Sequence, residues 1–426
     1  MSTTDERDTR SCLANVDNGV VSGPDLQRAA ERVVSDHFDG DVSLRIEHLV
    51  PDRLFSVVAR LRTIGGPSHV PETFVIKAAT PGQPTSAEQT LNDWAALQLL
   101  TELSAGEVPL APRYYGGDRS IPLVVMEDLG GGDGSPDLVV ERDDPDAATE
   151  SLLEYVRTVA RLHVQTMGHH ERHSRLRRSI GPPPPVARLY HDPWSDATAR
   201  TDSEISDAIR EYHEVLDGVG VSADPGVDEE IDAATRRVEH DPRPWLALCQ
   251  GDQNGQGNSL LRDGRLRLHD FGSGGFRHAL IEALPHRITW GCIRRVPDPV
   301  ATAMDAAYRA VLAETYPSMA TEPGYSQAAA DAMTRWHVFH VISRVPDALQ
   351  GDRPRGPATL RQQTLAWLDA YACWSDQQDR EGALARTAHR LVERLRQQWP
   401  PATHTIDYLP AYRDKNVRTD AAGRSI

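Results

Sequence analysis

The first part of the chain consists of short apolar runs separated by turn-forming residues. Runs rich in Val, Ile, Leu and Phe occupy residues 42–49, 55–61 and 72–78, with Pro or Gly between them. Short runs bounded by turn formers are typical of β-strands. Residues 25–37, just before them, instead carry apolar side chains at helical spacing. We therefore predict one short helix followed by three strands of an antiparallel sheet.

A longer helix and two more strands complete this part of the sequence. Residues 85–88 read Thr-Ser-Ala-Glu, which has the spacing of a helix-capping box, and helical apolar spacing continues after them. Residues 112–115 and 121–126 are short runs of strand type. The glycine-rich segment 127–134 then breaks the pattern, which indicates a hinge. Residues 23–126 are thus predicted to form a small lobe built around a sheet.

Beyond the hinge the apolar spacing is mainly helical, which predicts a second, larger lobe over residues 135–399. Residues 168–174 contain several histidines, but no acidic or cysteine partner lies at metal-ligand spacing, so we expect a solvated loop there. Residues 1–22 and 400–426 are polar; we expect the first segment to be disordered and the tail to be ordered only in part. The predicted helices cover residues 147–167, 203–216, 228–240, 301–315, 325–345, 357–376 and 382–398. The predicted fold class is therefore α+β, with an antiparallel-sheet N-lobe and a mainly helical C-lobe.

One short segment of the predicted C-lobe departs from helical spacing. An apolar run ends at Gly-Asp252, a loop of Gln, Asn and Gly follows, and Asn258 leads into an apolar run that ends at Asp270-Phe-Gly. This pattern predicts a strand, a polar loop, a second strand and a turn, with Asp263-Gly264 closing a hairpin. Each Asp-Gly or Gly-Asn pair alone is ordinary turn punctuation. Together they place two carboxylates and an amide on neighbouring loops, where their oxygens suit Mg²⁺ and phosphoryl transfer.

Lysine is so rare in this chain that its position is informative. The sequence contains two lysines, Lys77 and Lys415, and every other strongly basic residue is arginine. Lys415 lies in the polar tail, whereas Lys77 lies near the end of a predicted strand among apolar neighbours, where lysine is uncommon. The next helix carries Glu88 and Asp93, and the carboxylate of either residue could pair with the Lys77 ammonium. The sequence does not choose between them.

Composition narrows the class of protein and its partners. The formal net charge is −16 at pH 7, which argues against a nucleic-acid groove, and no basic face for a membrane surface is evident. No apolar run has the length of a membrane span, and the N-terminus is polar and acidic, so we expect a cytoplasmic protein. The four cysteines lack metal-type or disulfide-type spacing, so we expect free thiols.

The order of these motifs resembles the aminoglycoside phosphotransferase and choline kinase branch of the protein-kinase-like fold. The resemblance covers about residues 42–295, and its specific part is the pair of loops around Asp252 and Asp270. It implies a two-lobed protein-kinase-like fold that uses ATP, or another nucleoside triphosphate, together with Mg²⁺. It also implies that the acceptor is the hydroxyl of a small molecule, such as an aminoglycoside antibiotic, a sugar or an amino alcohol.

The resemblance assigns a role to each matching residue. Asp252 would be the catalytic base that accepts the proton of the acceptor hydroxyl, and Asn258 and Asp270 would hold Mg²⁺. Lys77 would neutralise the α- and β-phosphates and pair with Glu88 or Asp93. Val75 would cover the adenine ring, and the backbone near Glu127 and Leu129 would hydrogen-bond the base. The implied nucleotide-binding residues are therefore Lys77, Glu88, Asp93, Val75, Glu127 and Leu129.

Three departures from the family pattern affect this assignment. Gln250 stands where relatives have a histidine, although glutamine can still donate and accept hydrogen bonds. The interval from Asp252 to Asn258 is one residue longer than usual, which makes Asn254 a rival metal ligand; Asn258 is favoured because it directly precedes a strand. The acidic residues that often follow the turn are missing from their usual places. Because Lys77, Asp252, Asn258 and Asp270 are all present, we expect an active enzyme; the alternative is a nucleotide-binding pseudokinase.

The acceptor site is expected between the catalytic loop and the helices that follow residue 295. Several aromatic and histidine side chains there are candidates for its lining, and they are equally suited to a core: Trp290, Trp336, His337, His340 and Trp374.

Overall fold

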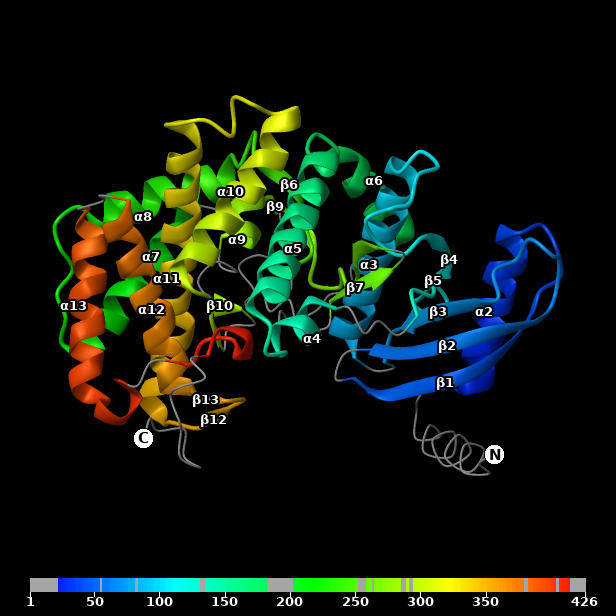
Figure 1. Cartoon of the computed structure of the whole chain (residues 1–426), viewed down its shortest axis with the longest axis horizontal. Coiled ribbons are helices and arrows are strands. Elements are labelled where there is room, and N and C mark those ends of the chain that lie inside the picture. The colour runs from blue at the N-terminus through cyan, green and yellow to red at the C-terminus, as the bar shows by residue number, and fades with distance from the viewer. Residues whose placement is uncertain are drawn as a thin grey trace.

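The computed structural model shows two lobes, a sheet-containing N-lobe drawn in blue to cyan and a helical C-lobe drawn in green to red (Figure 1). It describes residues 22–53, 56–80, 83–130, 135–181, 202–251, 258–262, 264–284, 289–290, 294–378, 382–403 and 406–413. The predicted α+β two-lobed architecture is confirmed. Residues 1–21, the end of the hinge segment, Asp252 and Asn254 lie outside the described residues. Within the described part of the chain, no helix has the length and apolar character of a membrane span.

The N-lobe is a five-stranded antiparallel sheet with the strand order β1-β2-β3-β5-β4. Its strands are β1 (Ser43–Arg53), β2 (Ser56–Gly65), β3 (Thr73–Ala78), β4 (Tyr114–Asp118) and β5 (Leu123–Glu127). Helix α2 (Gly23–His37) precedes the sheet, and the side chain of Ser22 caps it. All of these elements match predicted ones, and β3 and β5 lie next to each other in the centre of the sheet. The central position of β3 matters for the site, because β3 carries Lys77.

Helix α3 (Pro84–Leu103) forms where a helix was predicted, but its predicted capping box is wrong. The helix begins at Pro84, and its N-cap residue Gln83 makes no side-chain capping bond. Proline suits the first helical position, because the amide hydrogen that it lacks would have no partner there. The hydroxyl of Ser86 instead accepts the amide hydrogen of Thr80 at 2.7 Å, so it connects the helix to the end of β3.

The two faces of the sheet belong to two hydrophobic cores, because successive residues of a strand point to opposite sides. In β5, Val125 packs in a core that also holds α2, whereas Val124 and Met126 pack in the large core shared by α3 and the C-lobe. The sheet therefore lies between α2 and α3, and α3 connects it to the C-lobe core. This arrangement fixes β3 relative to the C-lobe.

The C-lobe is built from helices that largely match the predicted ranges. They are α4 (Pro136–Val140), α5 (Pro145–Thr166), α6 (His170–Ile180), α7 (Asp202–Val219), α8 (Val227–Thr235), α9 (Ala279–Ala283), α10 (Asp298–Thr315), α11 (Gly324–Gln350), α12 (Leu360–Gln377) and α13 (Ala383–Gln398). A π-helical turn, Arg236–His240, extends α8. The solvated loop expected at residues 168–174 is wrong: most of that segment lies in α6, and the His173 ring packs on Phe276 with 5.2 Å between ring centroids.

Short strand pairs interrupt the helices of the C-lobe. Strand β6 (Leu246–Cys249) pairs with β9 (Gly275–His278), and β7 (Ser259–Arg262) pairs with β8 (Arg265–Leu268). The β7–β8 hairpin was predicted, and Gly264 has the positive φ of 73° that its turn requires. The remaining pairs are β10 (Thr289–Trp290) with β11 (Arg294–Arg295) and β12 (Pro354–Arg355) with β13 (Ala358–Thr359). Two short 3₁₀ helices, Pro400–Thr403 and Pro410–Tyr412, follow α13.

Two isoleucines of the sheet provide a test of the N-lobe core. Ile76 in β3 is fully buried, whereas Ile64 in β2 is 58% exposed. We expect Ile76→Ala to lower the free energy of unfolding by about 2–5 kcal/mol, because it removes buried methyl groups and leaves a cavity. The same substitution at Ile64 should change it by less than about 0.5 kcal/mol. Equilibrium urea unfolding measures both, and equal effects would show that this face of the sheet is not a core.

Candidate active site

The centre of the candidate site is a cluster of one ammonium and two carboxylates. The ammonium of Lys77 forms an ion pair with Asp93 of α3 and lies 2.6 Å from a carboxylate oxygen of Asp270. Lys77 and Asp93 are both buried. Of the two acidic candidates on α3, the structure therefore brings Asp93 to Lys77. Glu88 is half-buried and lies near Arg177 instead. Burial lowers the pKa of the Arg177 guanidinium, and the negative charge of Glu88 offsets only part of that effect.

Asp93 also holds the Asp-Phe-Gly turn. Its second carboxylate oxygen accepts the backbone amide hydrogen of Phe271, whose ring is fully buried. The amide of Asn92, the preceding residue of α3, donates to the carbonyl of Gly272 at 3.1 Å. One turn of α3 thus connects strand β3 of the N-lobe to the Asp270 turn of the C-lobe. The turn is placed by buried hydrogen bonds and does not depend on contacts with solvent.

The charges of the cluster favour an additional cation. Burial works against the Lys77 charge, but Asp93 and Asp270 outweigh it, so the pKa of Lys77 is raised. Burial raises the pKa of Asp93 to about 6, even though Lys77 lowers it. For Asp270, the opposing effect of Lys77 outweighs burial and lowers the pKa. At neutral pH the cluster therefore carries two negative charges against one positive charge, and Asp270 has 37% of its side chain exposed to receive a cation.

The backbone of Asp270 has an unusual conformation. Its φ is +64°, in the left-handed region that residues other than glycine rarely adopt. Such a conformation persists only where the surroundings impose it, and it is most common at functional sites. Here the hydrogen bond from Phe271 to Asp93 and the ion pair to Lys77 are the surroundings that hold Asp270 in place.

Gln250 stands where the family that the motifs resemble has a histidine, and its side chain connects the two metal-ligand candidates. Its side chain is buried, and its amide nitrogen donates to the carbonyl of Asn258 at 2.8 Å and to the carbonyl of His269. The amide hydrogen of His269 also donates to the Asn258 carbonyl, at 3.0 Å. Asn258 and the residue before Asp270 are therefore fixed to each other and to the start of the predicted catalytic loop. Asp252 and Asn254, in the middle of this loop, lie outside the described residues.

Gly251 begins the predicted catalytic loop at a point where no side chain fits. Its φ is +88°, and a Cβ atom there would lie 2.0 Å from the carbonyl oxygen of Ser273. The loop therefore passes directly against the segment that follows the Asp-Phe-Gly turn. The amide hydrogen of Gly251 donates to a carboxylate oxygen of Glu282 at 2.9 Å, so the residue before Asp252 has a fixed position.

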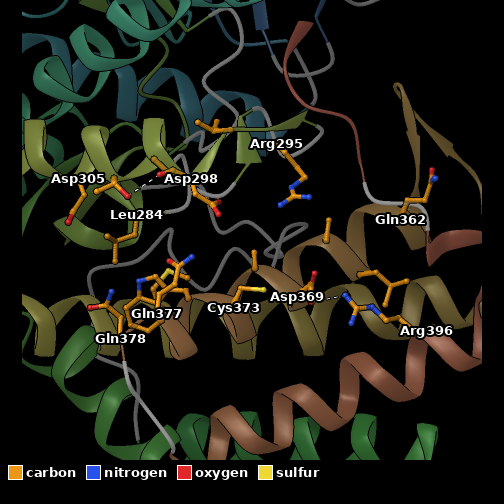
Figure 2. Close-up of a pocket in the computed structure, with 18 of the residues that line it drawn as sticks. Leu284, Arg295, Asp298, Asp305, Gln362, Asp369, Cys373, Gln377, Gln378 and Arg396 are labelled. Carbon is orange, nitrogen blue, oxygen red and sulfur yellow. Dashed lines mark hydrogen bonds and ion pairs between the residues drawn. The ribbon is translucent and has the colours of Figure 1, made fainter. Parts of the chain in front are cut away.

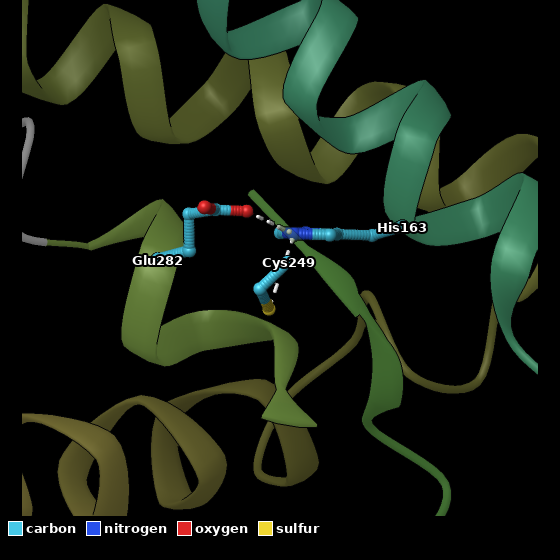
Figure 3. A group of neighbouring side chains, drawn as sticks. All are labelled: His163, Cys249 and Glu282. Carbon is cyan, nitrogen blue, oxygen red and sulfur yellow. Dashed lines mark hydrogen bonds and ion pairs between the residues drawn. The ribbon is translucent and has the colours of Figure 1, made fainter. Parts of the chain in front are cut away.

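Glu282 belongs to a buried polar group that the sequence did not reveal (Figure 3). Its other oxygen lies 3.0 Å from Nε2 of His163, and Nδ1 of His163 lies 2.9 Å from the Tyr308 hydroxyl. The thiol of Cys249 is 3.7 Å from His163. No acidic residue follows the turn at the usual family spacing, but Glu282 lies against the loop in the folded chain. In the sequence, Glu282 lies beyond the usual spacing after the turn, and His163 lies within a predicted helix, so no local pattern connected the two residues.

His163, Cys249 and Glu282 also have the ligand types of a metal site, with their ligand atoms within 4.8 Å of one another. Burial, together with Glu282, raises the pKa of the Cys249 thiol well above its ordinary value. The Glu282 oxygens already accept hydrogen bonds from Gly251 and His163. The group therefore functions best as a hydrogen-bonded support for the catalytic loop.

The predicted base-binding residues lie at the junction of the lobes. Val75 is half-buried on β3 and packs against the large core. The carboxylate of Glu127 accepts a hydrogen bond from Arg267 at 2.7 Å, and the carbonyl of Leu129 accepts one from Arg262 at 3.1 Å. Both arginines belong to the β7–β8 hairpin. Glu127 and Leu129 thus connect the hinge to the C-lobe, and their contact with a base stays a prediction.

A cavity of about 240 Å³ lies in the C-lobe near β11, and we call it the C-lobe pocket (Figure 2). Trp374 lines it, as the sequence allowed, whereas Trp336, His337 and His340 are buried core residues. The side chain of Trp290 lies outside the described ones. The pocket is lined by Leu284, Arg295, Val296, Asp298, Ala301, Thr302, Asp305, Met333, Gln362, Leu365, Ala366, Asp369, Ala370, Cys373, Trp374, Gln377, Gln378, Arg396 and Ala402.

The sequence matches no family model and no curated protein. Among solved structures, the chain is similar to the GDP complex of an aminoglycoside 2'-phosphotransferase-IIIa, with a TM-score of 0.44 and 12% identity over 82% of this chain and 99% of that chain. It is also similar to a choline kinase from Cryptosporidium parvum Iowa II, with a TM-score of 0.40 and 10% identity over 93% of this chain and 97% of that chain. Both belong to the groups of enzymes that the motifs resemble. Because these TM-scores and sequence identities are low, the activity of this chain has to be argued from its own residues.

The buried ion pair predicts a large effect of removing its lysine. Lys77→Met would leave the Asp93 carboxylate buried without its partner, so we expect the free energy of unfolding to fall by about 3–5 kcal/mol. Glu88→Gln on the same helix should change it by only about 0.5 kcal/mol. The double variant with Lys77→Met and Asp93→Asn should recover part of the loss, because the fully buried Asp93 charge is removed and only the partly exposed Asp270 carboxylate then lacks its partner. Equilibrium urea unfolding of the unchanged protein and the three variants measures these free energies. A loss for Glu88→Gln as large as that for Lys77→Met would contradict the pairing of Lys77 with Asp93.

Proposed function

We propose that this chain is a phosphotransferase that moves the γ-phosphoryl group of ATP, or of another nucleoside triphosphate, to the hydroxyl of a small molecule. The observation that carries the proposal is the meeting of Lys77 and Asp270, which are 193 residues apart in the chain, at 2.6 Å. A strand-end lysine, a buried helix carboxylate and an Asp-Phe-Gly aspartate form the set that phosphoryl transfer uses to hold nucleotide phosphates and metal.

The residues present suit Mg²⁺. Asp270 offers an exposed carboxylate in a cluster with excess negative charge, and Asn258 offers an amide on the adjoining segment. Mg²⁺ favours such oxygen ligands, from one or two protein groups together with substrate phosphates. When bound, the ion neutralises the negative charge of the phosphates. Asp270 and Asn258 are the residues that would hold it.

The chain's own residues have separate roles in this proposal. Lys77 binds phosphate oxygens, and Asp93 keeps the ammonium in position. The acceptor oxygen forms a bond to the γ-phosphorus, while the bond between that phosphorus and the β–γ bridging oxygen breaks and the nucleoside diphosphate leaves. Asp252 takes the proton of the acceptor hydroxyl, as the motif resemblance implies. Most of the acceleration then comes from positioning and from fixed charges.

The role of Asp252 has a direct test. Asp252→Asn removes the proton acceptor and keeps the size of the side chain, so we expect kcat to fall by roughly 10²–10⁴-fold. The Kd for Mg-ATP, measured by calorimetry, should stay close to that of the unchanged protein. The assay is the release of ADP with a panel of small alcohols, sugars and aminoglycosides. Full turnover in the variant would refute the assignment; ATP binding without turnover in the unchanged protein would favour a pseudokinase.

The two asparagines of the loop provide a matched pair for the metal site. Asn258→Ala should raise the Mg²⁺ concentration needed for half-maximal nucleotide binding by about tenfold or more, because it removes a metal ligand. Asn254→Ala, in the same loop, should leave that concentration unchanged. Nucleotide binding titrated against Mg²⁺ measures both. The reverse result would transfer the ligand role to Asn254.

A further inference from the structure

A series of hydrogen bonds connects helix α6 to the Asp-Phe-Gly turn through helix α3. Nε of Arg177, on α6, donates to Oδ1 of Asn92 at 2.9 Å. The amide nitrogen of Asn92 donates in turn to the carbonyl of Gly272 at 3.1 Å. Nη1 of Arg177 also donates to the carbonyl of Gly181, just after the end of α6, at 2.9 Å. The guanidinium therefore connects the end of its own helix to α3, against which α6 packs.

The chemistry of its two neighbours allows only one orientation of the Asn92 amide. A guanidinium donates hydrogen bonds and accepts none, whereas a backbone carbonyl accepts them and donates none. The amide oxygen of Asn92 must therefore face Arg177, and its nitrogen must face Gly272. Turning the amide over would place oxygen against oxygen and donor against donor, so both bonds would be lost. Arg177 thus determines that a donor points at the Gly272 carbonyl.

The position of Gly272 affects Asp270 directly. The backbone of Gly272 is buried, and an added Cβ there would lie 3.1 Å from the Cβ of Gln89 on α3 and 3.4 Å from a carboxylate oxygen of Asp270. Burial raises the pKa of Asp270 and Lys77 lowers it, and the backbone amide of Gly272 adds to the lowering. The carbonyl of Gly272 thus faces Asn92, while its amide acts on the Asp270 carboxylate. A shift of this one residue would displace the proposed metal ligand.

Arg177 differs in its surroundings from the arginine that follows it. Its guanidinium is half-buried, and burial lowers its pKa, which the charge of Glu88 offsets only in part. Arg178, the next residue of α6, is exposed. Because burying a cation is unfavourable unless it is hydrogen-bonded, the two bonds described above fix the position of the Arg177 guanidinium.

We propose that Arg177 is a positioning residue for the Asp-Phe-Gly turn. It orients the Asn92 amide, and that amide holds the Gly272 carbonyl. The Asp270 carboxylate is thereby kept in place for Mg²⁺, so loss of Arg177 lowers the affinity for Mg²⁺ with nucleotide. This inference rests on the function proposed above only in the role of Asp270 as a metal ligand. Its test uses the binding of ADP and needs no acceptor.

Three substitutions test the donor role of Arg177. Arg177→Met removes every donor, so we expect the Mg²⁺ concentration for half-maximal ADP binding to rise roughly three- to tenfold, the equivalent of one lost hydrogen bond. Arg177→Lys keeps a cation that only donates, so it should restore most of the affinity. Arg178→Met should leave that concentration unchanged, because Arg178 is exposed. Calorimetric titration of ADP into the full chain at several Mg²⁺ concentrations measures all three.

Two further measurements separate positioning from a general loss of structure. The affinity for ADP in the presence of EDTA should be the same in all of these variants, because no metal ion then connects the nucleotide to Asp270. Hydrogen exchange of the peptide that contains the Phe271 and Gly272 amides should be faster in Arg177→Met than in Arg178→Met. An equal loss of ADP affinity with and without Mg²⁺ would show that Arg177 binds the nucleotide itself or supports the fold, and would overturn the proposal.

A double-mutant cycle shows whether Arg177 acts through Asn92. Asn92→Ala removes the amide, so it should raise the Mg²⁺ requirement as much as Arg177→Met does. Combining the two substitutions should add nothing further, since the two side chains act in series. Additive effects would mean that Arg177 acts on the turn by another route. If Arg177→Met fails to fold, Asn92→Ala still decides the outcome, because an unchanged Mg²⁺ requirement in that variant refutes the proposal.

These outcomes are distinct from a failure of the proposed function. Absence of Mg²⁺-dependent ADP binding in the unchanged protein contradicts the proposed metal site and this inference with it. Mg²⁺-dependent binding that Arg177→Met and Arg178→Met alter equally, or that neither alters, contradicts the positioning role alone.

Discussion

The ion pair between Lys77 and Asp93 is the interaction on which the rest of the site depends. Neither charge is solvated, so each needs the other, and the geometry that satisfies them fixes β3 against α3. Asp93 also accepts the Phe271 amide hydrogen, which extends the same constraint into the C-lobe. A single carboxylate therefore sets the distance between the lysine of one lobe and Asp270 of the other.

The start and the end of the proposed catalytic loop, Gln250, Gly251 and Asn258, are held in the same way, by buried polar groups. Gln250 binds the carbonyls of Asn258 and His269, and Glu282 binds the Gly251 amide. These hydrogen bonds are strong in a buried setting, and leaving any of them unmade would be costly. The loop that carries Asp252, the proposed base, thus starts from residues with fixed positions, although its sequence is rich in Gly, Gln and Asn.

The local charges around Asp270 suit the phosphate half of the proposed reaction. Two carboxylates there face one ammonium, which favours a metal ion and the phosphates that accompany it. The strongly negative net charge of the chain does not predict this arrangement, because binding depends on the local positions of charges.

The sequence by itself determined most of the secondary elements, the two lobes and the order of the motifs, because these follow from local periodicity and turn chemistry. It missed helix α6, where a loop was expected. The scarcity of lysine also singled out Lys77. Only the tertiary structure chose Asp93 over Glu88: they are about 140° apart around the helix axis, and packing of α3 decides which one faces β3. The same holds for Glu282 and His163, which are 119 residues apart and meet only in the folded chain. Local patterns specify each element, but partners distant in the chain are specified only by how the elements pack.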